Sequence, residues 1–342
     1  MPKKEISNRS LNNARTEKKG EFYTQLTDIE KELKFYKNYF KGKVVYCNCD
    51  DPRISQFFNY FSSNFKHLQL KKLVTTCYKN QDMDLFTRNR SQKAIFLEYD
   101  GNKNDDLVLD PKKIGIKYLN GDGDFRSEES IALLKQADIV VTNPPFYLFR
   151  EYISQLFKYE KKFLIIGNIN AVSNKEVAIL MKENKLWLGP SIHSGDREFQ
   201  VPDDYPLEAA NFRIDEKGNK YISVKGVRWF TNLDHEERHK PLILYKKYYS
   251  NKKEYPKFDN YNAINVNFVK DIPKDYEGAM GVPLTFMDKY NPEQFEIISC
   301  NNIKTNKKIS DKEHGLIKDK DSAIKGKPTY VRIVIKNKIL ER

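Results

Sequence analysis

The chain has 342 residues and a formal net charge of +13, with 21 tyrosines and 21 phenylalanines, which allows two domains and favours a polyanionic partner such as nucleic acid. No apolar run approaches the roughly 18 residues that a transmembrane helix needs, and no signal peptide is visible, so a soluble, intracellular protein without a membrane partner is expected. Its cysteines (Cys47, Cys49, Cys77 and Cys300) are too few and too irregular for a disulfide framework, which predicts reduced thiols.

The first twenty residues are polar and basic, with isolated apolar positions that cannot form a core. Two interpretations are compatible with this composition. Residues 1–20 form a frayed terminus, or they form a basic arm that becomes ordered on a phosphate backbone.

The next stretch predicts a β-α-β unit. An apolar strand at 44–47 is followed by the polar turn Asn48-Cys49-Asp50-Asp51, and Pro52 suits the first position of a helix. A second apolar strand at 73–78 completes the unit. Three shorter strands, at 93–99, 106–110 and 115–119, are expected to form a hairpin insertion.

Strands and helices then alternate up to about residue 190. We expect a helix at 127–137, a buried strand at 138–142, a helix at 147–159 and further strands at 163–166 and 186–188. Such alternation predicts a doubly wound, mostly parallel α/β sheet.

Beyond residue 190 the helical periodicity ends, and short strands rich in tyrosine and lysine predict a β-rich C-terminal lobe. The expected organisation is therefore an arm at 1–20, an α/β domain at 21–190 and a separate region at 191–342. The strands expected in that region are 212–214 and 221–223, which form a hairpin, and 226–233, 241–249, 295–299 and 330–335.

The turn Asn143-Pro144-Pro145-Phe146 carries the strongest chemical signal. Two prolines stop the preceding strand, because neither has an N–H to donate to a sheet. The Asn143 amide and the Pro144 carbonyl offer hydrogen-bond acceptors, and Phe146 offers a flat face. Together they suit a planar amine, which has two N–H donors and a ring that stacks.

A proline-terminated strand with an ordinary core phenylalanine is the simpler interpretation of this turn. The complete quartet directly after a strand resembles the (Asn/Asp)-Pro-Pro-(Tyr/Phe) motif of amino-methyltransferases, which methylate adenine N6, cytosine N4 or glutamine amides with S-adenosylmethionine. The resemblance implies catalytic roles for Asn143, Pro144, Pro145 and Phe146.

Three motifs are expected to meet at one edge of the sheet. In a doubly wound sheet, a ligand lies where the strand order reverses, beyond the carboxyl ends of the strands. The Asp50 turn follows the first strand of the sheet and the Asn143 turn follows the fourth. Asp124 is expected to end the intervening strand and to lie at the same edge.

The resemblance extends beyond the quartet. Glu21-Phe22-Tyr23-Thr24 is similar to the amino-terminal cofactor motif of adenine-N6 DNA methyltransferases, and Gly123-Asp124-Phe125 is similar to their Gly-Asp-Phe motif. With 44–52, 163–172 and 280–295, the stretch from about residue 20 to 300 resembles the EcoRI-type adenine methyltransferases. The cofactor residues that this implies are Tyr23, Thr24, Asn48, Asp50, Asp124 and Phe125.

Two features depart from the common methyltransferase pattern. Asp50-Asp51-Pro52 stands where a glycine-rich cofactor loop is usual, a substitution that the EcoRI-type family shares. The strand that ends at Tyr78 lacks the acid that commonly holds the ribose hydroxyls, and Asp82 is the nearest carboxylate.

The family resemblance implies transfer of a methyl group from S-adenosylmethionine to a flipped-out adenine in double-stranded DNA, within a restriction-modification system. GAATTC is the first site to test. Residues 21–190 would form the cofactor-binding catalytic domain and 191–342 the target-recognition region of a cytoplasmic monomer that needs no protein partner.

Other functions remain open from the residues alone. The quartet also occurs in methyltransferases of RNA and of protein glutamine, and a non-enzymatic DNA-binding protein would share the charge. His235-Glu236-Glu237-Arg238-His239 fits the His-Glu-x-x-His pattern of zinc metalloproteases, although its charged flanks and Pro241 predict a surface turn without metal.

Overall fold

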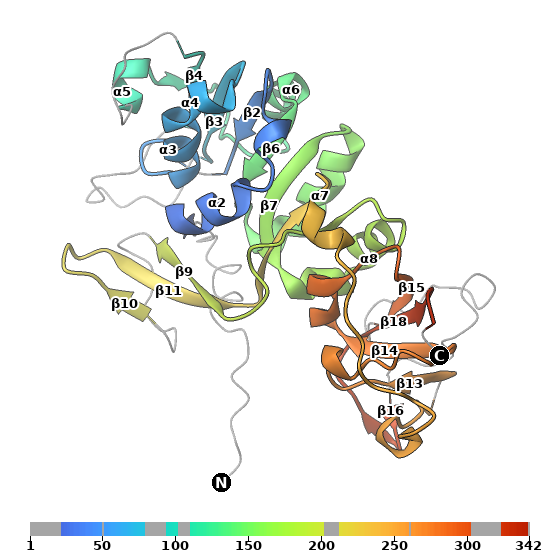
Figure 1. Ribbon diagram of the computed structural model, residues 1–342. Helices are drawn as coiled ribbons and strands as arrows, with labels where there is room; N and C mark the ends of the chain where they lie inside the picture. Colours follow the sequence, from blue (N-terminus) through green and yellow to red (C-terminus); the bar gives the residue numbers. More distant parts are fainter. Residues whose placement is uncertain are drawn as a thin grey trace. The chain divides into compact units, whose positions relative to one another are not determined.

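The computed structural model describes residues 22–49, 51–78, 94–101, 110–201, 212–259, 261–301 and 323–340. These residues form two compact units, many of whose helices and strands are labelled in Figure 1. The first unit contains the described residues up to Asn168 together with Ser194–Leu233, and the second contains Ile169–His193 and the described residues from Asp234 onward. The sequence predicted one change near residue 190, whereas the chain passes between the two units three times.

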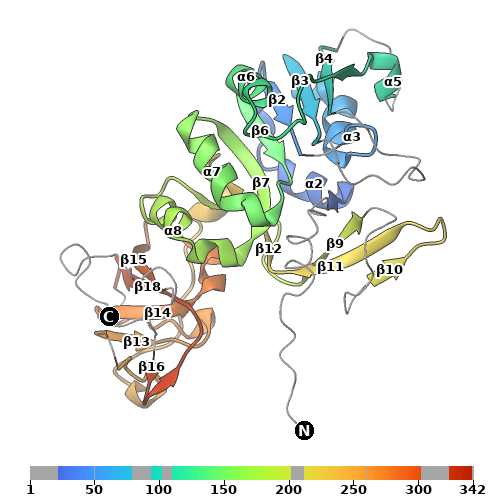
Figure 2. The same cartoon turned by 180° about the vertical axis from the view of Figure 1, so that it is seen from behind.

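Four parallel strands form the centre of the main sheet in the first unit (Figure 2). They are β2 (Val44–Cys47), β3 (Lys72–Thr76), β6 (Ile139–Thr142) and β7 (Lys162–Asn168), in the spatial order β3-β2-β6-β7. Most of their residues are buried, as is usual for parallel strands that are covered on both faces. The chain proceeds outward in opposite directions from β2 and β6, so the strand order reverses between these two.

Helices connect the parallel strands. Helix α2 (Leu26–Leu33) precedes β2, α3 (Gln56–Ser63) and α4 (Phe65–Leu68) join β2 to β3, α6 (Glu128–Gln136) precedes β6, and α7 (Phe149–Lys158) joins β6 to β7. The aromatic face of α3 is buried, and the Phe57 ring meets Trp229 edge-on at 6.1 Å. Burial of such large rings supplies a major part of the stability of this unit.

Antiparallel strands extend both edges of the main sheet. β4 (Ile95–Tyr99) pairs with β3, β5 (Lys117–Tyr118) pairs with β4, and β12 (Val227–Thr231) pairs with β7. The sequence correctly predicted strands at β4 and β12 but assigned β12 to a C-terminal lobe. All five residues of β12 are buried. The strand pairs with β7 and is buried in the main sheet, and not in a C-terminal lobe.

A second sheet of the first unit has the order β1-β9-β11-β10. Its strands are β1 (Tyr23–Thr24), β9 (Asp196–Val201), β10 (Phe212–Ile214) and β11 (Lys220–Lys225). The predicted hairpin of β10 and β11 is confirmed, and the Asp215 carboxylate closes its turn by accepting the backbone N–H groups of Lys217 and Asn219. Because β9 pairs with β1, this sheet fixes the start of the described chain.

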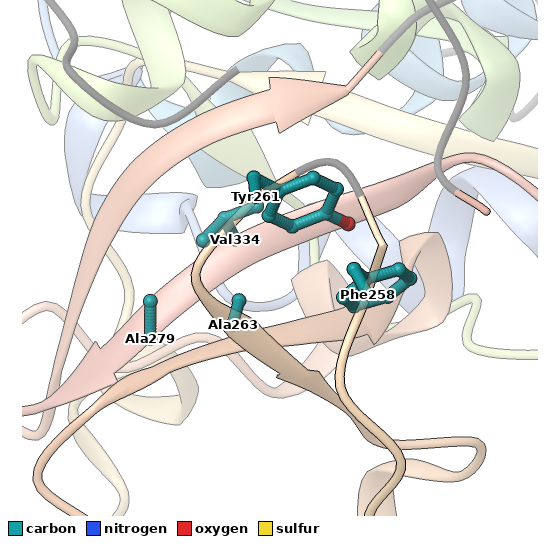
Figure 3. Close-up of a cluster of buried hydrophobic side chains, with 5 residues drawn as sticks. All are labelled: Phe258, Tyr261, Ala263, Ala279 and Val334. Atoms are coloured by element: carbon teal, nitrogen blue, oxygen red, sulfur yellow. The ribbon is translucent and has the colours of Figure 1, made fainter. Parts of the chain in front are cut away.

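The second unit contains a separate sheet of order β13-β14-β18-β15. Figure 3 shows a buried cluster on this sheet, in which the Phe258 and Tyr261 rings stack at 4.4 Å. A side chain at Gly281 would place its Cβ 2.6 Å from the Phe258 ring, so only glycine fits there. The elements of this unit are α8 (Lys175–Lys182), β8 (Trp187–Leu188), β13 (Ala263–Asn265), β14 (Ala279–Pro283), β15 (Phe295–Asn301), β16 (Ala323–Ile324), β17 (Lys327–Pro328) and β18 (Arg332–Asn337).

None of the helices within the described ranges is long and apolar enough to cross a membrane. The remaining helical elements are short turns. These turns are α5 (Pro111–Ile114), η1 (Lys37–Tyr39), η2 (Phe146–Leu148), η3 (Ile169–Ser173), η4 (Glu236–His239), η5 (Lys252–Glu254), η6 (Val269–Asp271) and η7 (Leu284–Lys289).

Two predicted elements differ from the structure. Pro52 does not begin a helix, because the Asp51 carbonyl first accepts the N–H of Ser55 in a turn, and Ser55 then caps α3. The segment 241–249 forms no strand: Lys246 makes an isolated bridge with Pro273, and Tyr248 begins a turn in which its carbonyl accepts the Asn251 N–H at 3.0 Å. The strand expected at 106–110 lies almost wholly outside the described residues.

Candidate active site

The Asn-Pro-Pro-Phe turn follows the carboxyl end of β6. Asn143 and Pro144 are buried, Pro145 and Phe146 are half-buried, and Phe146 begins the helical turn η2 that leads into α7. The Pro145 carbonyl accepts the Leu148 N–H at 2.9 Å. The turn's own hydrogen bond therefore uses the carbonyl of Pro145 and not that of Pro144.

A long-range hydrogen bond orients the Asn143 side chain. Its Nδ2 donates to the backbone carbonyl of Phe22 at 2.7 Å, across 121 positions of sequence. A carbonyl oxygen only accepts hydrogen bonds, so the amide nitrogen must be the atom that faces Phe22. The Asn143 Oδ1 atom is consequently directed away from Phe22, as an acceptor.

Three phenylalanine rings surround the turn. The Phe146 ring lies 5.9 Å from that of Phe22 and 6.4 Å from that of Phe199, in edge-on contacts, and the Phe22 and Phe199 rings are 5.8 Å apart. Sequence reasoning singled out Phe146 and missed Phe199. Phe199 lies in an alternating strand, β9, where the pattern predicts only a core residue.

Strand β1 carries the amino-terminal motif to this cluster. Tyr23 and Thr24 are buried and pair with Gln200 and Phe199 of β9. The Thr24 Oγ1 atom is buried and has no hydrogen-bond partner among the described residues. A buried hydroxyl without a partner costs free energy, which a polar ligand atom beside it would recover.

The ends of β2 and β6 are joined by side-chain hydrogen bonds. The Thr142 hydroxyl donates to the Asn48 carbonyl, and the Tyr152 hydroxyl donates to Asn48 Oδ1. Thr142 immediately precedes Asn143, so these bonds place the Asn48 turn beside the Asn-Pro-Pro-Phe turn. The predicted meeting of two turns more than ninety residues apart is confirmed by the pairing of β2 with β6.

The turn after β2 contains a residue in the left-handed backbone region. Cys49 has φ +70°, a conformation that glycine adopts readily and that costs a β-carbon-bearing residue about 1–3 kcal/mol at a constrained site. The sequence indicated that the usual glycine-rich loop is absent, and the structure retains a glycine-like conformation there nonetheless. Asp50, a predicted cofactor residue, lies outside the described residues, as does Asp82.

Gly123 places the third motif against the end of β3. Its φ is +75°, and a Cβ atom there would lie 2.2 Å from the Cys77 carbonyl oxygen and 2.9 Å from the Ala94 side chain. Only glycine permits so close an approach. Asp124 and Phe125, which follow, are thereby held near the carboxyl end of the parallel sheet.

Arg126 determines the electrostatics of Asp124. Partial burial acts to raise the pKa of the Asp124 carboxyl, but hydrogen bonds and the charge of Arg126 outweigh it and hold that pKa below its usual value. The carboxylate accepts Arg126 Nε at 2.9 Å and Nη2 at 2.7 Å, and Arg126 Nη1 also reaches Glu151 at 3.1 Å. Asp124 is therefore an ionised acceptor at neutral pH.

Helix α7 holds the motifs that surround it. The fully buried Tyr152 ring lies edge-on to Phe125 at 5.0 Å, while its hydroxyl binds Asn48. One turn further on, Gln155 Nε2 donates to the Phe125 carbonyl at 2.8 Å. Burial raises the pKa of Tyr152 well above its usual value, so this hydroxyl stays a donor. Sequence reasoning counted Tyr152 only as an apolar helix position.

The His-Glu-x-x-His pattern adopts a different geometry from that of a zinc-binding helix. It forms the 3-10 turn η4, in which residues four apart do not share a face. His235 Nε2 lies 3.0 Å from the Leu188 carbonyl, whereas the ring nitrogens of His239 each lie 2.9 Å from a carboxylate, of Glu293 and of Asp234. No cluster of three metal-ligating side chains occurs in the part of the chain that the structure describes.

An Asn-Pro-Pro-Phe turn at the carboxyl end of a parallel strand, with an oriented amide and an adjacent aromatic face, is characteristic of an amino-methyltransferase. Comparison with known proteins identifies the group within that class. The chain belongs to the family of the adenine-specific methyltransferase EcoRI, which it matches over residues 10–338.

The chain is similar along nearly its whole length to three curated proteins. It is 50% identical over 336 residues to the type II methyltransferase M.EcoRI of Escherichia coli, which covers 98% of both chains. It is 40% identical to M.MgeORF184P of Mycoplasma genitalium (95% of this chain, 98% of the relative) and 40% identical to M.MpnI of Mycoplasma pneumoniae (96% and 98%). No solved structure matches the chain.

Proposed function

We propose that the protein is a site-specific DNA adenine-N6 methyltransferase of a restriction-modification system. It transfers the methyl group of S-adenosylmethionine to a flipped-out adenine in duplex DNA. The observation that carries this proposal is the Asn143 amide, whose nitrogen is engaged by the Phe22 carbonyl so that its oxygen is directed away as an acceptor. Membership of the adenine-specific family supports the choice of amine.

The strand order supports a doubly wound methyltransferase sheet with a nucleotide-like cofactor at its edge. The order reverses between β2 and β6, and ligands of open α/β sheets bind beyond the carboxyl ends of strands at such a reversal. Asn48 and Asn143 follow these two strands. The C-terminal region would then recognise the target sequence.

The residues at this edge suit S-adenosylmethionine, which supplies an electrophilic methyl group on a sulfonium. The buried Thr24 hydroxyl lacks a partner among the described residues, and the Asp124 carboxylate is an ionised acceptor suited to an exocyclic amine or a hydroxyl. Tyr23, Asn48, Asp50 and Phe125 would complete the contacts. A polar ligand at Thr24 would remove an unfavourable buried group.

The catalytic turn acts by orientation. Asn143 Oδ1 and the Pro144 carbonyl accept the two N–H groups of adenine N6, which directs the nitrogen lone pair towards the methyl group. Phe146 stacks on the extrahelical base, and the edges of the Phe22 and Phe199 rings hold Phe146 in place. Pro145 fixes the backbone between these groups, because its ring restricts φ.

Duplex DNA is favoured over RNA or a protein glutamine by the relatives, which are named type II methyltransferases, and by the net charge of +13. GAATTC is the first site to test, since half of the residues are identical to M.EcoRI. A cytoplasmic monomer is the proposed form of the enzyme.

The decisive experiment combines sequencing with one substitution. Methylation-sensitive sequencing of DNA from a host that expresses the protein should show N6-methyladenine at one short sequence. Asn143→Ala should abolish that mark and slow transfer by about 10²–10³-fold, by analogy with the loss of an oxyanion-hole hydrogen bond, while DNA binding remains. Asn59→Ala, a matched change on α3, should methylate like the wild type. Near-normal turnover of Asn143→Ala would contradict the catalytic assignment.

A further inference from the structure

A segment of the second unit that belongs to no sheet presents a row of outward side chains. From residue 241 to 249 the odd-numbered positions are all exposed. Ile243, Tyr245 and Tyr249 are 68%, 78% and 60% exposed, and Lys247 lies among them. We call the outward residues Ile243, Tyr245, Lys247 and Tyr249, with Lys252 and Lys253 that follow, the tyrosine–lysine row.

The backbone beneath this row is held in place at alternate positions. Both backbone groups of Leu242 bond to the Gln294 amide at 2.7 Å. The Lys246 carbonyl accepts the Lys274 N–H at 3.0 Å, and the Tyr248 N–H donates to the Asp275 carboxylate at 2.6 Å. The row is therefore presented by a fixed backbone, although the segment belongs to no sheet.

Aromatic packing supports the inner side of the segment. The Tyr248 ring lies 4.4 Å from that of Tyr276 and 5.7 Å from that of Tyr255. The Tyr255 hydroxyl in turn donates to the Asp271 carbonyl at 2.9 Å. Since inward tyrosines are packed and bonded, the exposure of Tyr245 and Tyr249 does not result from a loose segment.

The positive charge of the segment indicates a polyanionic partner. Residues 241–254 contain four lysines and one acid, Glu254, which lies 3.4 Å from Lys246. Lys252 lies over the Tyr249 ring at 5.4 Å. Ammonium groups beside exposed aromatic and aliphatic surfaces suit a polyanion that has apolar sugar faces, which describes a nucleic-acid backbone.

We propose that the tyrosine–lysine row binds the sugar–phosphate backbone of duplex DNA. The assignment rests on the proposed function, because that function supplies the DNA. Lys247 lies directly before the turn at Tyr248, and Lys253 lies in the 3-10 turn η5, so two short adjacent segments present the two exposed ammonium groups. Lys247 and Lys253 contact phosphates, and the Tyr245 ring packs on deoxyribose. Such contacts position the enzyme and do not read the sequence.

The test is a salt titration of DNA binding. The double variant Lys247→Gln/Lys253→Gln removes two exposed charges from the row, and Lys175→Gln/Lys182→Gln removes two exposed charges from α8 of the same unit. Fluorescence anisotropy measures the Kd of each full-length protein for a labelled GAATTC duplex and a scrambled duplex across a salt series.

The row variant should lower the slope of log Kd against log salt by roughly 2, since each phosphate contact contributes about 0.9. Its loss of affinity should be equal for both duplexes, and the α8 variant should match the wild type. Tyr245→Ser should weaken binding to both duplexes without changing the slope. Unchanged melting temperatures would establish that the variants are folded.

An unchanged slope and affinity in the row variant would overturn the proposal. A loss confined to the GAATTC duplex would overturn it too, because the row would then read bases. Absence of methylation by the wild type would contradict the proposed function alone, since the salt titration reports on the row independently of turnover.

Discussion

The candidate active-site edge of the first unit and the tyrosine–lysine row of the second differ in how far their functional groups are buried. At the edge, polar groups are buried, and partners from distant segments orient them, as the Phe22 carbonyl does for Asn143. In the row, the backbone is fixed but the side chains remain in solvent. A buried, mutually bonded site should fail sharply when one contact is lost, whereas an exposed row should respond in small additive steps.

Gly123→Ala should have the largest effect on the stability of the candidate active-site edge. The new Cβ would collide with the Cys77 carbonyl, and the positive φ adds about 1–3 kcal/mol of strain. Gly218→Ala is the matched control, because Gly218 also has a positive φ but has nothing within 4 Å of the added carbon. Urea unfolding should show a clearly greater loss of stability for Gly123→Ala. Equal losses would mean that crowding at the edge is unimportant.

Tyr152→Phe should separate an effect on stability from an effect on cofactor binding. It removes the hydroxyl that binds Asn48 and leaves a buried acceptor unsatisfied, at a cost of about 1–3 kcal/mol. Tyr36→Phe removes a similar buried hydroxyl, which donates to Glu32 at 3.0 Å away from the site. Both variants should unfold more easily, but only Tyr152→Phe should raise the KM for S-adenosylmethionine more than it changes kcat. If the KM of Tyr152→Phe for S-adenosylmethionine is unchanged, as is expected for Tyr36→Phe, then Tyr152 has only a packing role in the core.

The Asp124–Arg126 pair predicts a pH dependence of stability. The pKa of Asp124 is lowered in the folded protein from its ordinary value of 3.8, so the ionised carboxylate stabilises the fold above that pH. This contribution should be lost as the pH falls below 3.8 through the folded-state pKa. Thermal melts of wild type and Asp124→Asn should therefore converge at acid pH. Arg126→Gln should weaken this pH dependence, because it removes the guanidinium and leaves only the backbone N–H of residue 126 to offset burial.

Cys49→Gly should have the smallest effect. Glycine accepts φ +70° without strain but loses more chain entropy on folding, so we expect a stability change within about 1 kcal/mol. Gln69→Gly, at φ +52° outside the site, is the control. Methyl transfer by Cys49→Gly should remain close to wild type. A large loss of transfer would show that the thiol itself, and not the backbone conformation, matters at this turn.

Local pattern determined much of this protein. Apolar runs identified β2, β6 and β7, two prolines ended the strand at Asn143, and a polar turn predicted the β10–β11 hairpin. These signals are short-range, because backbone propensity and side-chain periodicity act over a few residues. The alternation of elements also sufficed to place the Asn48 and Asn143 turns together, since the reversal of strand order follows from topology.

Tertiary structure alone decided the orientation of the site. Nothing in the sequence near Asn143 indicates that Phe22 will accept its amide, that Phe199 will pack against Phe146, or that Tyr152 will bind Asn48. The same is true of β12, which joins the main sheet and not the lobe that its position in the chain suggested. Each contact joins segments distant in the chain, and it forms because burial of apolar surface and satisfaction of buried polar groups are decided over the whole fold.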